Sequence, residues 1–265
     1  MNPSEMDALV ERIGDEILAR LGRGPALATG PNLLSTSGPA SWPRPQDGYA
    51  ARLEAGAAGP GVTAGAVEAA CGQAVELGLR AVWTAGSWTA RALRVVGGSS
   101  VRLGAVTGFP YGDSPTAAKR VEAEVALSNG AAELLTSFDA GAWASGEWDR
   151  VYADLIGVGE VATSAGAAWG VAVEAAALDE AAVVKAAIAA KLAGAGAIYL
   201  GGWASHAAFG PARVGHVREA VGDEVAVGVW GEMAGFGAAA AWAAAGACRL
   251  SCPDPAAVLR EAPRG

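Results

Sequence analysis

Short apolar runs and amphipathic stretches alternate along most of this chain. From about Tyr49 onward, runs rich in Val, Ile, Leu and Ala are separated by segments whose apolar residues recur at helical spacing. The runs predict strands near residues 49–55, 79–84, 101–107, 132–137, 168–174, 196–201, 225–230 and 246–251. The intervening stretches predict helices that include 63–77, 114–129, 147–164, 179–193, 211–222 and 236–245. Strands that alternate with helices indicate an α/β protein with a parallel sheet. Eight such units over residues 49–265 match the size of a (β/α)8 TIM barrel.

A different pattern precedes the barrel. Ser4 is a good N-cap, and the residues after it place one apolar stripe along a helix over 4–21, formed by Met6, Leu9, Val10, Ile13, Ile17 and Leu21. Residues 22–48 are rich in Gly and Pro and have no period, which is typical of a flexible linker. We therefore predict three segments: an amphipathic helix within 1–21, a linker over 22–48 and the barrel over 49–265.

The composition narrows the class of protein. Apolar residues make up 52% of the chain and charged residues 17%, which is enough apolar material for a large core. The net charge of −8 argues against nucleic acid or an anionic membrane as a partner. No apolar run approaches the roughly 18 residues of a spanning helix, and the first residues do not resemble a signal peptide. These features predict a cytoplasmic protein.

The cysteines offer little chemistry. Cys248 and Cys252 have a spacing used by metal sites, but no second Cys or His pair accompanies them. We interpret both, with Cys71, as small buried hydrophobic residues in a reducing compartment. We therefore expect neither a metal nor a cofactor.

Motifs in the middle of the chain carry a family resemblance. The segment Ala105-Val106-Thr107-Gly108-Phe109-Pro110-Tyr111-Gly112 is followed by Lys119, Glu122 and Gly130-Ala131-Ala132-Glu133. A further segment reads Ser145-Gly146-Glu147-Trp148-Asp149-Arg150-Val151-Tyr152-Ala153-Asp154-Leu155. Together they resemble the deoxyribose-phosphate aldolase family over about residues 50–260, outside the N-terminal helix and linker.

The resemblance implies a reaction centre that this chain lacks. In that family a lysine on the sixth strand forms a Schiff base, a second lysine on the seventh lowers the pKa of the first, and an aspartate on the fourth handles protons. At the corresponding positions we place Leu200, Trp230 and Leu135. None of these side chains can form an imine or transfer a proton. Imine-forming aldolase activity is therefore not expected.

The lysines of the chain and the expected phosphate loops also argue against aldolase activity. Lys119, Lys185 and Lys191 fall within predicted outer helices, where we expect solvated charges away from the catalytic rim. After the sixth strand Gly201 and Gly202 keep a flexible loop. After the seventh and eighth strands, Glu232, Pro253 and Asp254 stand where the family binds phosphate, and carboxylates there would repel it.

The rim that we predict at the strand ends is aromatic. Nine tryptophans are present, and we place three of them (Trp83, Trp203 and Trp230) at or just after strand ends. With Gly201 and Gly202 they could line a pocket for an apolar or planar ligand, or they could plug a lost reaction centre. Candidates for a rim acid or base are Asp139, Glu174, His206 and Glu232.

The N-terminal helix allows two interpretations. It could pack on the barrel or contribute to a dimer. Alternatively, it resembles the encapsulation peptides of bacterial microcompartment cargo, which bind shell proteins or other cargo through such a stripe. We predict a non-catalytic or repurposed aldolase-like protein of a microcompartment, associated with itself or with an intact aldolase paralogue. The alternative is a carbon–carbon lyase for a small aldehyde or sugar phosphate that uses no Schiff base.

Overall fold

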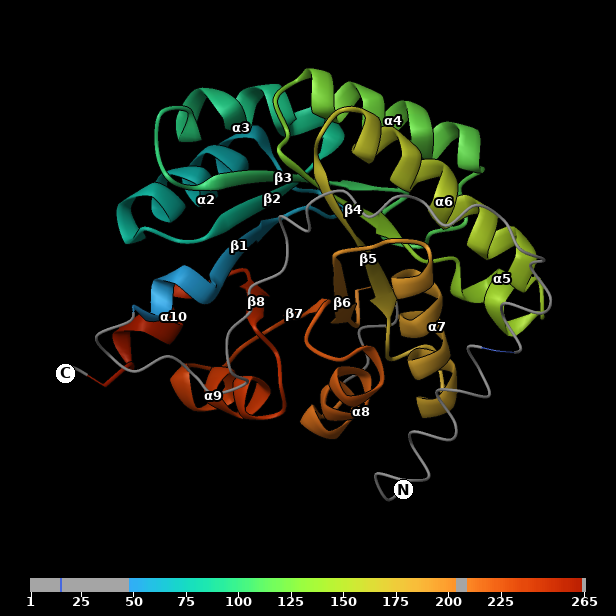
Figure 1. Cartoon of the computed structure of the whole chain (residues 1–265). Coiled ribbons are helices and arrows are strands. Elements are labelled where there is room, and N and C mark those ends of the chain that lie inside the picture. Colours follow the sequence, from blue (N-terminus) through green and yellow to red (C-terminus); the bar gives the residue numbers. More distant parts are fainter. Residues whose placement is uncertain (1–14, 16–47, 204–208, 264–265) are drawn as a thin grey trace.

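The computed structural model describes residues 48–203 and 209–263, together with Asp15. Within this part of the chain, eight parallel strands form one closed barrel in sequence order, and β1 pairs with β8. Figure 1 views the barrel along its axis, with the helices in a ring outside the strands. The strands are β1 (Leu53–Ala57), β2 (Ala81–Ala85), β3 (Arg102–Thr107), β4 (Glu133–Ser137), β5 (Ala168–Glu174), β6 (Ala197–Gly201), β7 (Ala226–Trp230) and β8 (Arg249–Cys252). The prediction of a (β/α)8 barrel is confirmed.

The outer ring follows the predicted helices closely. It comprises α2 (Ala64–Leu77), α3 (Thr89–Val96), α4 (Thr116–Ser128), α5 (Ala140–Ala144), α6 (Trp148–Ser164), α7 (Glu180–Leu192), α8 (Pro211–Val221), α9 (Phe236–Ala244) and α10 (Pro255–Arg260). We did not predict α3, α5 or α10, which are among the shorter helices. Two short 3-10 helices, η2 (Tyr49–Arg52) and η3 (Gly86–Trp88), complete the described elements. Because η2 occupies the residues before Leu53, β1 starts four residues later than the apolar run suggested.

Short polar side chains fix where several helices begin. Thr63, Asp139, Asp179 and Asp254 each accept a hydrogen bond from the backbone N–H three residues ahead. Such N-caps satisfy donors that the first helical turn leaves unpaired. At the other end of α2, Gly78 adopts the left-handed conformation (φ 64°), which favours glycine.

The strands separate two packed layers. Side chains of successive residues point alternately to the barrel interior, here called the lumen, and to the surrounding helices. The layer between strands and helices contains most of the apolar core, including Val171, Val173, Ile198, Leu200, Val227 and Val229. The lumen holds a separate cluster that includes Trp83, Val106, Leu135, Tyr199 and Trp230. A lumen filled with side chains is a packed core and no pore.

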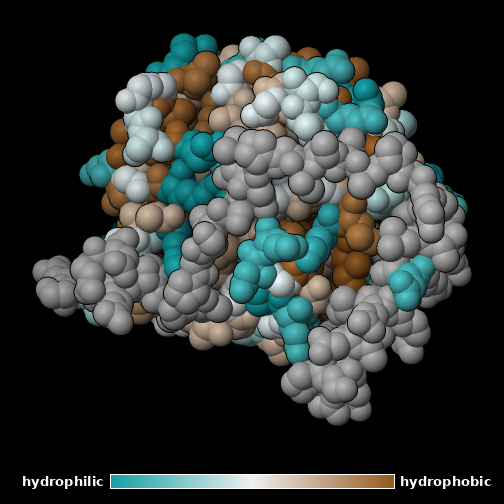
Figure 2. Space-filling view, in the orientation of Figure 1, coloured by the Kyte–Doolittle hydropathy of each residue, from teal (hydrophilic) through white to brown (hydrophobic). Residues whose placement is uncertain are grey.

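Three predicted features lie outside the described residues. They are the apolar stripe of the helix over 4–21, the linker over 22–47 and His206. In the part of the chain that the structure describes, no helix has the length and hydropathy needed to cross a membrane. Figure 2 shows hydrophilic residues gathered toward the middle of the face in view, with hydrophobic residues scattered among hydrophilic ones over α3 and α4.

Candidate functional site

Aromatic rings fill the mouth of the barrel at the carboxyl ends of the strands. Trp230, the last residue of β7, is 5% exposed. Phe109, which follows β3, stacks on it with ring centroids 5.6 Å apart and an interplanar angle of 23°. Trp203, which follows β6, stands nearly perpendicular to Trp230 at 6.0 Å and contacts Phe109 at 5.5 Å. The three rings therefore pack on one another at the place where barrel enzymes carry their reacting groups.

Glycines on the strands make room for these rings. A Cβ added to Gly56 on β1 would lie 2.8 Å from Nε1 of Trp230, so the indole crosses from β7 over β8 to β1. A Cβ on Gly201 would lie 2.5 Å from the Trp203 ring. Deeper in the lumen, a Cβ added to Gly104 would lie 2.2 Å from the Trp83 ring, and one added to Gly228 would lie 2.6 Å from the Tyr199 ring. Each large ring thus lies against a residue without a side chain.

The alternation of side chains corrects the position assigned on β6. Leu200 belongs to the layer between the strands and the helices, so it does not face the lumen. Its neighbour Tyr199 does, because its hydroxyl reaches Glu54 of β1 across the barrel at 2.9 Å. A one-residue shift along a strand moves a side chain to the opposite face. The lumen position of β6 is therefore held by Tyr199. On β4 and β7 the assigned residues, Leu135 and Trp230, do face the lumen.

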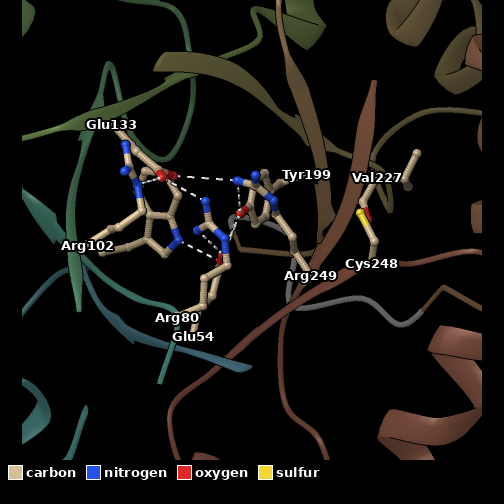
Figure 3. Close-up of polar contacts among 9 residues, drawn as sticks. Glu54, Arg80, Arg102, Glu133, Tyr199, Val227, Cys248 and Arg249 are labelled. Carbon is tan, nitrogen blue, oxygen red and sulfur yellow. Dashed lines mark hydrogen bonds and ion pairs between the residues drawn. The ribbon is translucent and has the colours of Figure 1, made fainter. Parts of the chain in front are cut away.

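A network of buried charges occupies the opposite, amino-terminal half of the lumen (Figure 3). The carboxylate of Glu54 accepts hydrogen bonds from Arg80 (2.6 Å), Trp83 Nε1 (2.7 Å) and Tyr199. Arg80 also donates to Glu133 at 2.7 Å, and Arg102 and Arg249 approach the same carboxylate. The network thus links the starts of β1, β2, β3, β4 and β8, and it reaches Tyr199 in the middle of β6.

The network shifts the pKa values of Glu133 and Tyr199 in opposite directions. Burial raises the pKa of Glu133, but Arg80 and Arg249 outweigh that effect and leave the pKa below its ordinary value. Burial, with Glu54 alongside, raises the pKa of Tyr199 well above its usual value. Tyr199 is therefore a neutral hydrogen-bond donor tied to the base of the lumen and cannot act as an acid or base at the mouth. The sequence signal that we overlooked is a charged residue at the start of several apolar strands.

Lys119 is buried, contrary to the expectation of a solvated helix charge. Its side chain has no exposed surface, and its ammonium donates to Asp154 Oδ2 at 2.6 Å and to the Ser137 carbonyl at 3.0 Å. Because α4 packs against α6, this pair joins two helices outside the barrel wall. Lys185 lies over the Trp148 ring at 5.3 Å, and Lys191 donates to the Val221 carbonyl at 2.8 Å. These contacts place all three lysines on the outer helices and none in the lumen.

The predicted rim acids have separate environments. Asp139 is 6% exposed, caps α5 through Ala142 N–H at 2.8 Å and pairs with Arg150 at 2.5 Å, so it has a structural role. Glu174 ends β5, on the lumen side, and is also 6% exposed. Glu232 is exposed after β7. The structure does not bring these carboxylates into one pair.

Trp83 does not lie on the rim. It is the middle residue of β2, is fully buried and donates to Glu54, so it belongs to the interior of the lumen. We expected Trp83 near the carboxyl end of its strand because the apolar run was taken to stop at residue 84, whereas β2 continues to Ala85. Among the candidates for a ligand pocket, Trp203, Trp230 and Gly201 come together at the mouth, with Gly202 directly after β6.

The thiols are unpaired and buried. Burial, with a contribution from nearby carboxylates, raises the pKa of Cys71 to about 11 and that of Cys252 to about 12. Among the described residues, no group of three His, Cys, Asp or Glu side chains is placed to hold a metal ion.

Fold and site together define a (β/α)8 barrel whose mouth carries aromatic side chains. The chain is 35% identical over 210 residues to deoxyribose-phosphate aldolase of Mycolicibacterium paratuberculosis, a match that covers 76% of this chain and 90% of that protein. It is also 35% identical over 217 residues to deoxyribose-phosphate aldolase of Nocardia farcinica, covering 79% and 92%. The chain belongs to the deoxyribose-phosphate aldolase family.

Solved structures share this fold. Deoxyribose phosphate aldolase from Aeropyrum pernix, described as a tetramer, superposes with a TM-score of 0.73 at 22% identity, over 94% of this chain and 96% of that one. The aldolase QR15 superposes with a TM-score of 0.72 at 25% identity, over 79% and 93%. No family model matches the sequence.

Proposed function

We propose that this chain is a non-catalytic member of the deoxyribose-phosphate aldolase family. The observation that carries the proposal is the set of side chains facing the lumen on β4, β6 and β7, namely Leu135, Tyr199 and Trp230. A Schiff base needs an amine that is partly neutral and can reach the substrate. The three lysines of the sequence contact groups on the outer helices instead.

Trapping with borohydride tests this proposal. The full chain is incubated with deoxyribose 5-phosphate and sodium borohydride, and its intact mass is measured. We expect no mass increase, because no lysine amine faces the lumen. The relative from Mycolicibacterium paratuberculosis, treated in parallel, is the positive control. A reduced imine mapped by peptide sequencing to any lysine of this chain would overturn the proposal.

A lyase that uses no Schiff base is the second candidate. Glu174 favours it, since a largely buried carboxylate at the carboxyl end of a barrel strand is a typical acid or base. A retro-aldol assay that detects the released aldehyde separates the two candidates. Turnover that Glu174→Gln abolishes would support the lyase.

We further propose that the protein acts by association inside a bacterial microcompartment. The support is the apolar stripe predicted over residues 4–21 and the linker after it. A lone helix of this length is marginal in water and gains stability in the groove of a shell or cargo protein. Val121 and Val125, exposed and one turn apart on α4, offer a second point of contact for self-association or for an intact paralogue. Deleting residues 1–24 should abolish co-localisation and leave the melting temperature of the barrel nearly unchanged.

A further inference from the structure

The outer face of α4 carries apolar side chains at positions that face solvent. Val121 and Val125, one turn apart, are 57% and 47% exposed, and Ala117 and Ala118 in the preceding turn are exposed too. The opposite side of the helix, which includes Lys119, is buried. A surface helix ordinarily has polar residues opposite its buried side. We call the face formed by the two valines and two alanines the α4 surface.

Further apolar side chains border both ends of the α4 surface. Tyr111, in the loop before α4, is 62% exposed. Leu93 of α3 is 40% exposed and lies against Gly130, just after α4, where a Cβ would be 2.6 Å from Cδ2 of the leucine. Among the described residues, four of the five exposed large hydrophobic side chains therefore lie on α4 or at its ends, and Val75 of α2 is the fifth. Such clustering indicates an interaction site, whereas single exposed apolar residues are common.

The charges beside the α4 surface favour an occupant that brings a cation. Arg120 already donates to Glu160 at 2.9 Å and to the Gly157 carbonyl at 3.0 Å. Glu124 is exposed and makes no ion pair within the part of the chain that the structure describes. Two copies of α4 packed face to face would bring Glu122 and Glu124 of both together, and such like charges repel. An apolar stripe bordered by a basic residue fits this face better.

The helix predicted over residues 4–21 has these properties. Its apolar stripe from Met6 to Leu21 would be about 22 Å long, and the 13 residues of α4 span about 20 Å. Arg20, three residues after Ile17, borders the stripe on a helix and can meet Glu124. The predicted helix and the α4 surface are therefore matched in length and complementary in charge.

The linker allows this helix to reach α4 of its own chain. Residues 22–47 join it to η2, and as a flexible linker these 26 residues would span about 28 Å on average. α4 follows β3, which is two strands from β1, and packed helices lie about 8–10 Å apart. A tether of this kind keeps the local concentration of the helix in the millimolar range, so even weak docking is populated.

We propose that the predicted helix over residues 4–21 docks on the α4 surface of its own chain, with its apolar stripe against Val121 and Val125. While it is docked, neither the stripe nor the α4 surface is open to another protein. A partner that captures the helix uncovers the α4 surface, so both contacts of the proposed association become available together. This last step rests on the proposed function, whereas the docking itself needs neither a microcompartment nor the loss of catalysis.

Hydrogen–deuterium exchange of the full chain, followed by mass spectrometry, tests the docking. We expect the amides of residues 4–21 to exchange about tenfold more slowly than those of a synthetic peptide of residues 1–24, because a docked helix is protected and an isolated one is marginal. The protection should not change when the protein is diluted about tenfold, since the contact is intramolecular.

Two variants locate the protecting surface. Val121→Ser/Val125→Ser should return residues 4–21 to the exchange rate of the peptide, and the fold should tolerate it because both side chains are exposed. Val75→Ser is the matched control: this valine of α2 is 39% exposed and lies outside the α4 surface, so protection should persist.

Three results would each overturn the proposal: no protection in the wild type, protection that survives the double variant, or protection that disappears on dilution. The last would identify a second copy as the occupant. Co-localisation that survives deletion of residues 1–24 would instead overturn the proposed association and leave the exchange result standing.

Discussion

The close approach of Gly56 to the Trp230 indole permits a sharp test of the packed mouth. A methyl group at position 56 would lie 2.8 Å from Nε1 and 3.0 Å from Cε2 of that indole. The indole has little room to retreat, because Phe109 stacks on it and Trp83 lies 6.3 Å from it on the lumen side. Gly56→Ala must therefore displace packed rings or the backbone of β1.

The magnitudes follow from the packing of interiors. Forcing a methyl into a packed core costs about 1–3 kcal/mol, which we expect for Gly56→Ala. Trp230→Ala should cost about 3–5 kcal/mol, because a nearly buried indole leaves a void. In the Trp230→Ala background the methyl at position 56 enters that void, so Gly56→Ala should cost close to nothing. The two changes should therefore be coupled by about 1–3 kcal/mol.

Urea unfolding followed by circular dichroism measures all four proteins of this cycle. Gly72→Ala is the matched control, since a Cβ there has no atom within 4 Å, and its effect should be the same with either residue at position 230. If Gly56→Ala costs equally in both backgrounds, the indole does not lie over β1. If Trp230→Ala has the same free energy of unfolding as the wild type, the indole does not fill the mouth of the barrel.

Two further predictions concern the buried charges. Glu133→Gln should cost about 3–5 kcal/mol at pH 7, because Arg80 and Arg249 lose a buried counter-ion. The folded pKa of Glu133 lies below its unfolded value, so this stabilisation is present above about pH 4.3 and is lost as the pH falls through the folded pKa. The urea midpoints of the wild type and of Glu133→Gln should therefore converge in acid. A difference between the two midpoints that stays constant with pH would contradict the network. Lys119→Met should destabilise the fold more than the double variant Lys119→Met/Asp154→Leu does, because only the single change leaves a buried carboxylate unpaired. Thermal melts measure both variants, and a lower melting temperature for the double variant would refute the pairing.

The sequence indicated the barrel because apolar runs and helical periodicity are local signals. Strands β3 to β7 lie within one residue of their predicted ends, since long apolar runs leave few alternatives. The start of β1 was missed because η2 continues the same apolar character. Such errors at the ends of elements do not disturb the order of the units.

The site was harder to predict because it depends on which face a residue occupies. Assigning Leu200 in place of Tyr199 is an error of one position, yet it exchanges the helix side of β6 for the lumen side. The burial of Lys119 depends on Asp154, 35 residues away, and no local pattern joins the two. The Glu54–Glu133 network likewise joins residues from six strands, so its partners meet only in the closed barrel.

The pairing of glycines with large rings constrains the route by which this mouth could have arisen. An indole at position 230 is strained by about 1–3 kcal/mol while residue 56 carries a Cβ, whereas a glycine at position 56 without the indole leaves only a small void. A route that introduces the glycine before the ring therefore avoids the strained intermediate. The same pairing bears on engineering: placing a lysine at position 230 alone would leave an amine on a flexible stem beside an unfilled gap. Exchanging the ring for a firmly held polar group therefore takes two substitutions, one at position 230 and one at position 56.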